Sequence, residues 1–319
     1  MDPGSKNRRV LVTGATGFIG SNLARKLLNE GYEVYILARK SSSLWRIADI
    51  KDRLRIFNAT LEDFGEIDRA VSEIKPEIIF HLATYGGFSD QKEPDKIIDT
   101  DVIGTMNLFK ACLRQGFSLF VNTGSSSEYG LKEHPMSEQD ELMPITYYGA
   151  TKAAMSQFFS RIAKSQNLNI VTLRPFAVYG YYEEKERLVP HIIISSLKNW
   201  EPRLSTPTSV RDFVFVEDVV EAYIATIGKK EIAGECFNIG SGQQHSIGEL
   251  ARLAIELCGK KLRAIYGTRP STQTVEPSCW VADISKAEKL LGWKPKHSLR
   301  EGLTKSIDWF RKNTALYED

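Results

Sequence analysis

The stretch that decides the fold of this chain is Arg9-Val10-Leu11-Val12-Thr13-Gly14-Ala15-Thr16-Gly17-Phe18-Ile19-Gly20. A short aliphatic and β-branched run ends at Thr13, three glycines follow, and an amphipathic run begins at Ser21. This order predicts a strand, a tight turn and the start of a helix. Gly14 allows a backbone conformation that other residues avoid, Gly17 lets a phosphate approach the main chain, and Gly20 lets the helix pack closely on the strand.

The glycine spacing is G-x-x-G-x-x-G, not the commoner G-x-G-x-x-G, and three glycines alone could belong to a structural turn. Their position between a predicted strand and a predicted helix favours a dinucleotide-binding loop. There, the free N–H groups and the positive dipole end of the helix face a pyrophosphate. The residues expected to contact the cofactor in this loop are Gly14, Gly17, Phe18, Ile19 and Gly20.

Composition excludes several classes of protein. The chain has 319 residues, 42% hydrophobic and 26% charged, and a net charge of +2. These values are ordinary for a globular protein and predict neither a nucleic-acid partner nor a membrane partner. No apolar stretch approaches the ~20 residues that span a bilayer. The N-terminal segment is polar, and the four cysteines show no metal-binding spacing, so we expect a cytoplasmic protein with reduced thiols and no metal.

Strand and helix patterns alternate through the first half of the chain. Further strands are expected at Glu33–Leu37, Leu54–Phe57, Glu77–His81, Ser118–Asn122 and Ile170–Leu173. Helices are expected at Phe64–Ile74, Lys96–Arg114 and Tyr147–Gln166. This alternation predicts an α/β fold with a doubly wound parallel sheet of the Rossmann type, in which ligands bind at the carboxyl ends of the strands.

The segment after the second strand bears on the choice of cofactor. NAD-selective sites usually place an acid there, whereas this chain has Ala38, Arg39 and Lys40. Because a guanidinium can hold a 2′-phosphate with forked hydrogen bonds, Arg39 favours NADP(H), and NAD(H) stays possible. A solvated basic loop is the alternative interpretation.

The ends of the third and fourth strands supply more cofactor contacts. We expect Thr60 and Leu61 to border the adenine, and Leu82 and Ala83 to pass the ribose and phosphates. His81 is interpreted as a packed histidine rather than a catalyst.

A tyrosine and a lysine carry the predicted chemistry. Tyr148 and Lys152 are four residues apart on a predicted helix, so their side chains leave the same face. A free tyrosine, with a pKa near ~10, is a poor base at neutral pH, and a nearby cation favours its phenolate form. Such pairs are usually packing beside a solvated charge. Here the pair follows a dinucleotide loop and a strand that ends in a serine cluster beginning at Ser125, which favours catalysis.

Three segments resemble the extended short-chain dehydrogenase/reductase family: Thr13–Gly20, Ser125–Gly130 and Tyr148–Lys152. Later matches are Arg174–Gly180, Arg211–Val220, Phe237–Gly240 and Leu291–Pro295. The resemblance covers residues 8 to 312. It implies an enzyme that acts on a nucleotide-diphosphate sugar as a 4-epimerase, 4,6-dehydratase, 4-ketoreductase or decarboxylase. These motifs specify the family much more closely than the reaction.

The resemblance also implies roles for single residues. Tyr148 is the general acid/base, Lys152 its partner and a ligand of the nicotinamide ribose, and Ser125 a donor to the reacting oxygen. Pro175 joins the cofactor-binding set. The implied substrate-binding residues are Tyr85, Ser126, Arg211 and Arg269. Surface ion pairs are the alternative for the two arginines.

The implied organisation has two domains and two subunits. Residues 8–178 plus 213–240 form the dinucleotide-binding Rossmann domain. Residues 179–212 plus 241–319 form a smaller mixed α/β domain that binds the nucleotide sugar. In this family, the helices expected at 96–114 and 147–166 build a homodimer through a four-helix bundle.

Departures from the family pattern narrow the reaction. Dehydratases carry an Asp-Glu pair where this chain has Ser126 and Ser127, which disfavours dehydration. Asp101 and Ala177 stand where many members have Asn. With Arg39, the pattern favours an NADP(H)-dependent 4-ketoreductase that transfers a hydride to C4 while Tyr148 donates a proton. The alternatives are an NAD-dependent UDP-glucose 4-epimerase-like enzyme and, from another class, a non-catalytic NADP-binding sensor.

Overall fold

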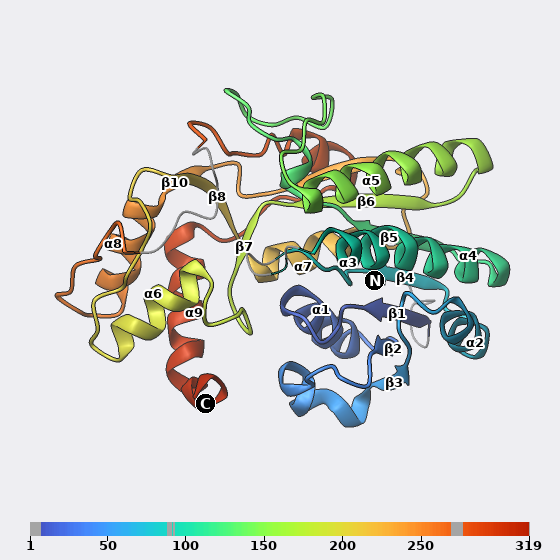
Figure 1. Cartoon of the computed structure of the whole chain (residues 1–319), viewed down its shortest axis with the longest axis horizontal. Helices are drawn as coiled ribbons and strands as arrows, with labels where there is room; N and C mark the ends of the chain where they lie inside the picture. Colours follow the sequence, from blue (N-terminus) through green and yellow to red (C-terminus); the bar gives the residue numbers. More distant parts are fainter. Residues whose placement is uncertain (1–7, 88–90, 92, 269–276, 319) are drawn as a thin grey trace. The chain divides into compact units, whose positions relative to one another are not determined.

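The computed structural model describes residues 8–87, 91, 93–268 and 277–318 (Figure 1). The chain divides into two compact units. The first unit comprises Met1–Gly130, Glu141–Arg174 and Ala222–Phe237, and the second comprises Leu131–Asp140, Pro175–Glu221 and Asn238–Asp319. Among the described residues, no helix is both long enough and apolar enough to cross a membrane.

A seven-stranded sheet with the order β3-β2-β1-β4-β5-β6-β9 organises the first unit. The strands are β1 (Arg9–Thr13), β2 (Glu33–Ala38), β3 (Arg55–Asn58), β4 (Ile78–His81), β5 (Leu119–Thr123), β6 (Ile170–Pro175) and β9 (Cys236–Ile239). Every pair from β3 to β6 is parallel. The order reverses between β1 and β4, which places the ligand crevice of a doubly wound fold at their carboxyl ends. The predicted fold class is confirmed.

Helices cover both faces of this sheet. A core under α2 (Phe64–Ile74), α4 (Thr105–Gln115) and α5 (Tyr147–Gln166) contains Ile79 and Phe120. The neighbour of Ile79 on β4, Phe80, points to the opposite face because side chains alternate along a strand. There Phe80 packs edge-on against Tyr223 of α7 (Val216–Ala225), with ring centroids 5.9 Å apart.

The helix expected at 96–114 is continuous but not uniform. It consists of α3 (Pro94–Ile98), a π-helical segment at Asp99–Gly104, and α4. A π turn inserts an extra residue and is frequent at functional sites. Here the segment contains Asp101, whose buried carboxylate accepts hydrogen bonds from the segment after β4. Periodicity could not reveal the wider turn, since it depends on this tertiary contact.

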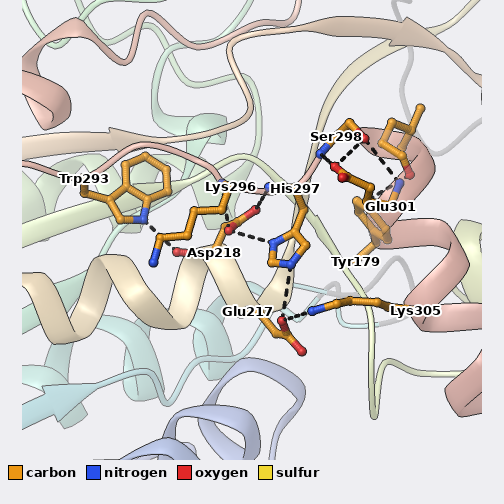
Figure 2. Close-up of polar contacts among 10 residues, drawn as sticks. Tyr179, Glu217, Asp218, Trp293, Lys296, His297, Ser298, Glu301 and Lys305 are labelled. Carbon is orange, nitrogen blue, oxygen red and sulfur yellow. Dashed lines mark hydrogen bonds and ion pairs between the residues drawn. The ribbon is translucent and has the colours of Figure 1, made fainter.

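The second unit has a smaller mixed sheet, ordered β10-β8-β7. Strand β7 (Ala177–Tyr179) pairs in parallel with β8 (Val210–Phe215), and β10 (Gln244–Ser246) is antiparallel to β8. Three helices pack together beside it, namely α6 (Leu188–Leu197), α8 (Ile247–Leu257) and α9 (Leu299–Lys312). Capping boxes start α8 and α9, as Figure 2 shows for Ser298 and Glu301.

A buried aspartate anchors the segment before α9 (Figure 2). The Asp218 carboxylate accepts from the backbone N–H groups of Lys296 and His297, and His297 Nδ1 lies 2.9 Å from Asp218 Oδ1. The Asp218 carbonyl accepts from Trp293 Nε1 at 2.8 Å. The segments Arg211–Val220 and Leu291–Pro295, which resemble family motifs, therefore help to hold the second unit together through these contacts.

The close approach at Gly14 gives a stability prediction. Its φ is +71°, and an added Cβ would lie 2.6 Å from the backbone nitrogen of Ala83. Gly31 also has a positive φ, +89°, but an added Cβ would meet nothing within 4 Å. Both alanine substitutions carry backbone strain, and only Gly14→Ala adds a clash. We expect Gly14→Ala to lower the free energy of unfolding by about 1–3 kcal/mol more than Gly31→Ala in urea titrations. Equal losses would contradict the close approach.

Candidate functional site

The glycine loop lies between β1 and α1 (Phe18–Asn29) and forms a cradle for an anion. The Gly17 N–H donates to the Gly14 carbonyl at 2.9 Å, and an added Cβ on Gly20 would lie 2.2 Å from that oxygen. No side chain caps the N-terminus of α1. Its N–H groups can therefore receive a phosphate. Side chains would fill the cradle, so the loop fits a dinucleotide cofactor, with Phe18 and Ile19 in the first turn of the helix.

The other predicted cofactor residues follow the carboxyl ends of neighbouring strands. Arg39 follows β2 and is exposed, and no ion pair of its guanidinium is found among the described residues. Thr60 and Leu61 follow β3, and the Thr60 N–H donates to Glu66 Oε2 at 2.9 Å. The carboxyl ends of parallel strands meet at one edge of the sheet, so these residues share that edge.

Leu82 and Ala83 follow β4 directly behind the glycine loop. Leu82 is buried, and the Ala83 N–H donates to Thr13 Oγ1 at 3.2 Å. Pro175 is the last residue of β6 and is grouped with the second unit.

His81 is a buried histidine with both ring nitrogens hydrogen-bonded. Its Nδ1 lies 2.7 Å from Thr13 Oγ1, and its Nε2 lies 2.8 Å from Thr105 Oγ1. Because the Thr105 hydroxyl donates its hydrogen to the Asp101 carbonyl, Nε2 must be the protonated nitrogen of His81. Burial, assisted by the charge of Lys152, lowers the pKa of His81 to about 3. His81 is therefore neutral and holds the strand ends together, as the sequence suggested.

Tyr148 and Lys152 lie on α5 with their side chains close together. The ammonium of Lys152 is buried, donates to the Thr123 carbonyl at 3.1 Å and lies 5.6 Å from the centroid of the Tyr148 ring. Tyr148 is half-buried, whereas Tyr147 is 64% exposed. An added Cβ on Gly149 would lie 2.5 Å from the Ser127 carbonyl, so the start of α5 packs directly on the serine cluster.

Ser125 is oriented to donate a hydrogen bond. It is the N-cap of a 3₁₀ turn at Ser126–Glu128, and its Oγ accepts from the Ser127 N–H at 3.1 Å. Its hydroxyl hydrogen is therefore left for another acceptor, such as the oxygen of a substrate. Ser126, predicted to bind substrate, is buried in this turn.

Asp101 connects α5 to the segment after β4. Its carboxylate accepts from the Tyr85 N–H at 2.8 Å and from Thr84 Oγ1 at 2.9 Å, and Thr151 Oγ1 lies 3.4 Å away. Burial raises the pKa of Asp101, and the charge of Lys152 opposes that effect. The carboxylate of Asp101 thus fixes the backbone of Tyr85, which is predicted to bind substrate, and the Tyr85 hydroxyl donates to Glu93.

Of the two arginines predicted to bind phosphate, the structure describes only Arg211. Arg211 lies on β8 in the second unit, with its guanidinium 5.6 Å from the Trp280 ring centroid. Its neighbour Asp212 is buried and accepts from both the N–H and the hydroxyl of Ser241 at 2.6 Å. Arg269 lies outside the described residues. The structure therefore brings together Ser125, Tyr148 and Lys152 in one unit, and the arginine roles stay predictions.

Sequence reasoning assigned no role in the site to several residues that contact Tyr148, Lys152 or their immediate neighbours. They are Asp101, Thr123, Glu128, Arg174 and Tyr223. Only Glu128 had a usable local signal, because a serine followed three residues later by a glutamate is the pattern of a capping box. Among the described residues, no group of three or more His, Cys, Asp or Glu side chains could hold a metal ion.

The fold and site define a dinucleotide-binding enzyme with a tyrosine–lysine pair, and comparison identifies its family. The model of the NAD-dependent epimerase/dehydratase family matches residues 10–240. The chain therefore belongs to the NAD-dependent epimerase/dehydratase family, which confirms the resemblance drawn from the motifs.

Similar proteins span almost the whole chain. A UDP-glucose 4-epimerase from Mycolicibacterium smegmatis is 30% identical, covering 96% of this chain and 99% of its own. A UDP-glucose 4-epimerase from Thermotoga maritima, solved with UDP-glucose, has a TM-score of 0.88 at 28% identity, covering 96% and 99%. A UDP-glucuronic acid 4-epimerase from Bacillus cereus, solved with UDP-glucuronic acid and NAD, has a TM-score of 0.84 at 27% identity, covering 95% and 99%.

The neutral state of His81 predicts a pH dependence of stability. In the unfolded chain, His81 binds a proton below its ordinary pKa of 6.5. In the folded chain, His81 stays neutral until the pH falls to about 3. Stability is therefore complete above pH 6.5 and is lost as the pH falls toward 3. Between pH 6.5 and 5, we expect His81 to cost about 2 kcal/mol of unfolding free energy.

Urea titrations at several pH values test this dependence. His81→Asn should flatten the acid side of the profile, whereas the same change at the exposed His134 should not. Parallel profiles for the unaltered chain and His81→Asn would contradict a buried neutral imidazole.

Proposed function

We propose that this chain is a nucleotide-sugar 4-epimerase that uses a nicotinamide dinucleotide. The observation that carries the proposal is the buried Lys152 beside Tyr148, packed against the segment of Ser125. The similar proteins named above support epimerisation of a UDP-sugar over the 4-ketoreduction that the sequence alone favoured. In this proposal, the first unit binds the cofactor and the second binds the nucleotide sugar, where Arg211 contacts the diphosphate.

Tyr148, Lys152 and Ser125 have separate roles in proton transfer and charge stabilisation at C4. A nicotinamide held by the glycine loop would supply the hydride acceptor and donor for oxidation and reduction at C4. Tyr148 accepts the proton of the C4 hydroxyl during oxidation and gives it back during reduction. Lys152 stabilises the phenolate form of Tyr148, which is present before the proton is accepted and again after it is given back. Ser125 donates its hydroxyl hydrogen to the C4 oxygen and so stabilises charge that develops there.

A catalytic role for Tyr148 predicts a loss of turnover without a loss of cofactor binding. Tyr148→Phe removes the group that carries the proton, and we expect kcat to fall at least about 100-fold. The measurement is NMR detection of the C4 epimer from UDP-glucose and UDP-glucuronic acid, with fluorescence titration of the cofactor.

Tyr147→Phe is the matched control, because Tyr147 is exposed and one residue away. Retained turnover in Tyr148→Phe would refute the proposed mechanism. An unaltered chain that responds to cofactor but converts no sugar would be the sensor. Stoichiometric consumption of NADPH with a 4-keto sugar, without epimerisation, would identify the ketoreductase.

The choice between NAD and NADP depends on Arg39 in this proposal. Arg39 lies at the end of β2 with an exposed guanidinium, where it can bind a 2′-phosphate. Arg39→Asp should then weaken NADPH at least about tenfold more than NADH in fluorescence titrations. Lys40→Asp, at the next exposed position, should have a smaller effect because an ammonium lacks the forked geometry. Equal losses for both cofactors would remove Arg39 as a phosphate ligand and favour NAD.

A further inference from the structure

Glu128 is a fully buried carboxylate that the proposed mechanism does not use. Its Oε2 lies 2.7 Å from Arg174 Nε, and Arg174 is itself only 5% exposed in its side chain. Arg174 Nη1 donates to the Tyr129 hydroxyl at 2.9 Å, and its guanidinium lies 4.9 Å from the centroid of that ring. The ion pair is therefore held at both ends, and Glu128 has little freedom to move.

The other carboxylate oxygen contacts two elements of the candidate site. Glu128 Oε1 accepts from the Ser125 N–H at 2.8 Å and from Ser156 Oγ at 2.9 Å. Ser156 is on α5, four residues after Lys152 and eight after Tyr148, so the three side chains leave the same face of the helix. One oxygen thus joins the backbone of Ser125 to the helix of the acid/base pair.

This oxygen also packs closely against the backbone of Gly124. An added Cβ on Gly124 would lie 2.3 Å from Glu128 Oε1, so the carboxylate lies directly against the backbone that precedes Ser125. The capping box fixes Ser125 a second time, because its Oγ accepts from the Ser127 N–H. Together these contacts hold the backbone and the Oγ of Ser125 in place.

We propose that Glu128 is a positioning residue that fixes the Ser125 hydroxyl relative to Tyr148. The inference rests on the proposed function, because the distance between the Ser125 hydroxyl and Tyr148 matters only if both groups act on the same substrate oxygen. Its physical basis is that a shift of about 1 Å in a positioned group can cost up to about 100-fold in rate. Arg174 supplies a countercharge next to the buried carboxylate and holds it in place.

Two variants test the connection that Glu128 makes between Ser125 and α5, one at the helix and one at the carboxylate. Ser156→Ala removes the donor on α5 and keeps the ion pair. Glu128→Gln keeps the length of the side chain and removes its charge. We expect kcat to fall about tenfold in Ser156→Ala and more in Glu128→Gln, with KM for the sugar nucleotide changing less than about twofold, because ground-state binding does not need the alignment.

Ser196→Ala is the matched control for stability. Ser196 is also a fully buried helical serine, and its hydroxyl donates to the Ile192 carbonyl at 2.7 Å on α6. A purely structural role for Glu128 predicts that Ser156→Ala and Ser196→Ala lower the unfolding free energy alike and leave kcat per folded molecule unchanged. That result would overturn the proposal.

Crystal structures of the unaltered chain and Glu128→Gln provide a readout that does not need turnover. The proposal expects Ser125 Oγ to leave the Ser127 N–H in the variant, and an unmoved Ser125 would overturn it. If the unaltered chain converts no nucleotide sugar, the proposed function fails, and the position of Ser125 in these structures still decides the role of Glu128.

Discussion

A buried ammonium group requires acceptors and countercharge, and the carboxyl edge of the large sheet is arranged around that of Lys152. It donates to the Thr123 carbonyl at the end of β5 and lies beside the Tyr148 ring. Its charge also acts on Asp101 and His81. The segments that contain His81, Asp101 and Thr123 therefore lie together with α5 around one buried cation. The same four segments form the candidate site.

The ionisable side chains of this cluster, His81, Lys152 and Asp101, differ in whether they carry a charge. His81 stays neutral, so no second cation competes with Lys152, and it fastens Thr13 to Thr105 instead. Asp101 supplies a buried carboxylate to this cluster. That carboxylate also fixes the backbone beside the predicted substrate loop. Electrostatics and loop geometry are thus set by the same side chains.

The remaining buried carboxylates act as anchors. Glu128 joins the serine turn to α5, and in the second unit Asp212 and Asp218 each accept several backbone N–H groups from distant segments. A carboxylate can accept from several donors at once, which makes it suited to fixing loops that have no regular structure. The segment that begins at Arg211 therefore contains structural aspartates next to a residue proposed to bind the substrate.

Local patterns in the sequence were enough for the glycine loop, the strands of the alternating half, and helices such as Phe64–Ile74 and Tyr147–Gln166, because periodicity and turn chemistry depend on neighbouring residues. The same holds for the tyrosine and lysine one helical turn apart. The π turn at Asp99–Gly104, the burial of Glu128 against Arg174 and the tautomer of His81 were decided only in the folded chain. The contacts at these places join residues 16 to 46 positions apart in the chain, and no local pattern records which buried polar group will meet which partner.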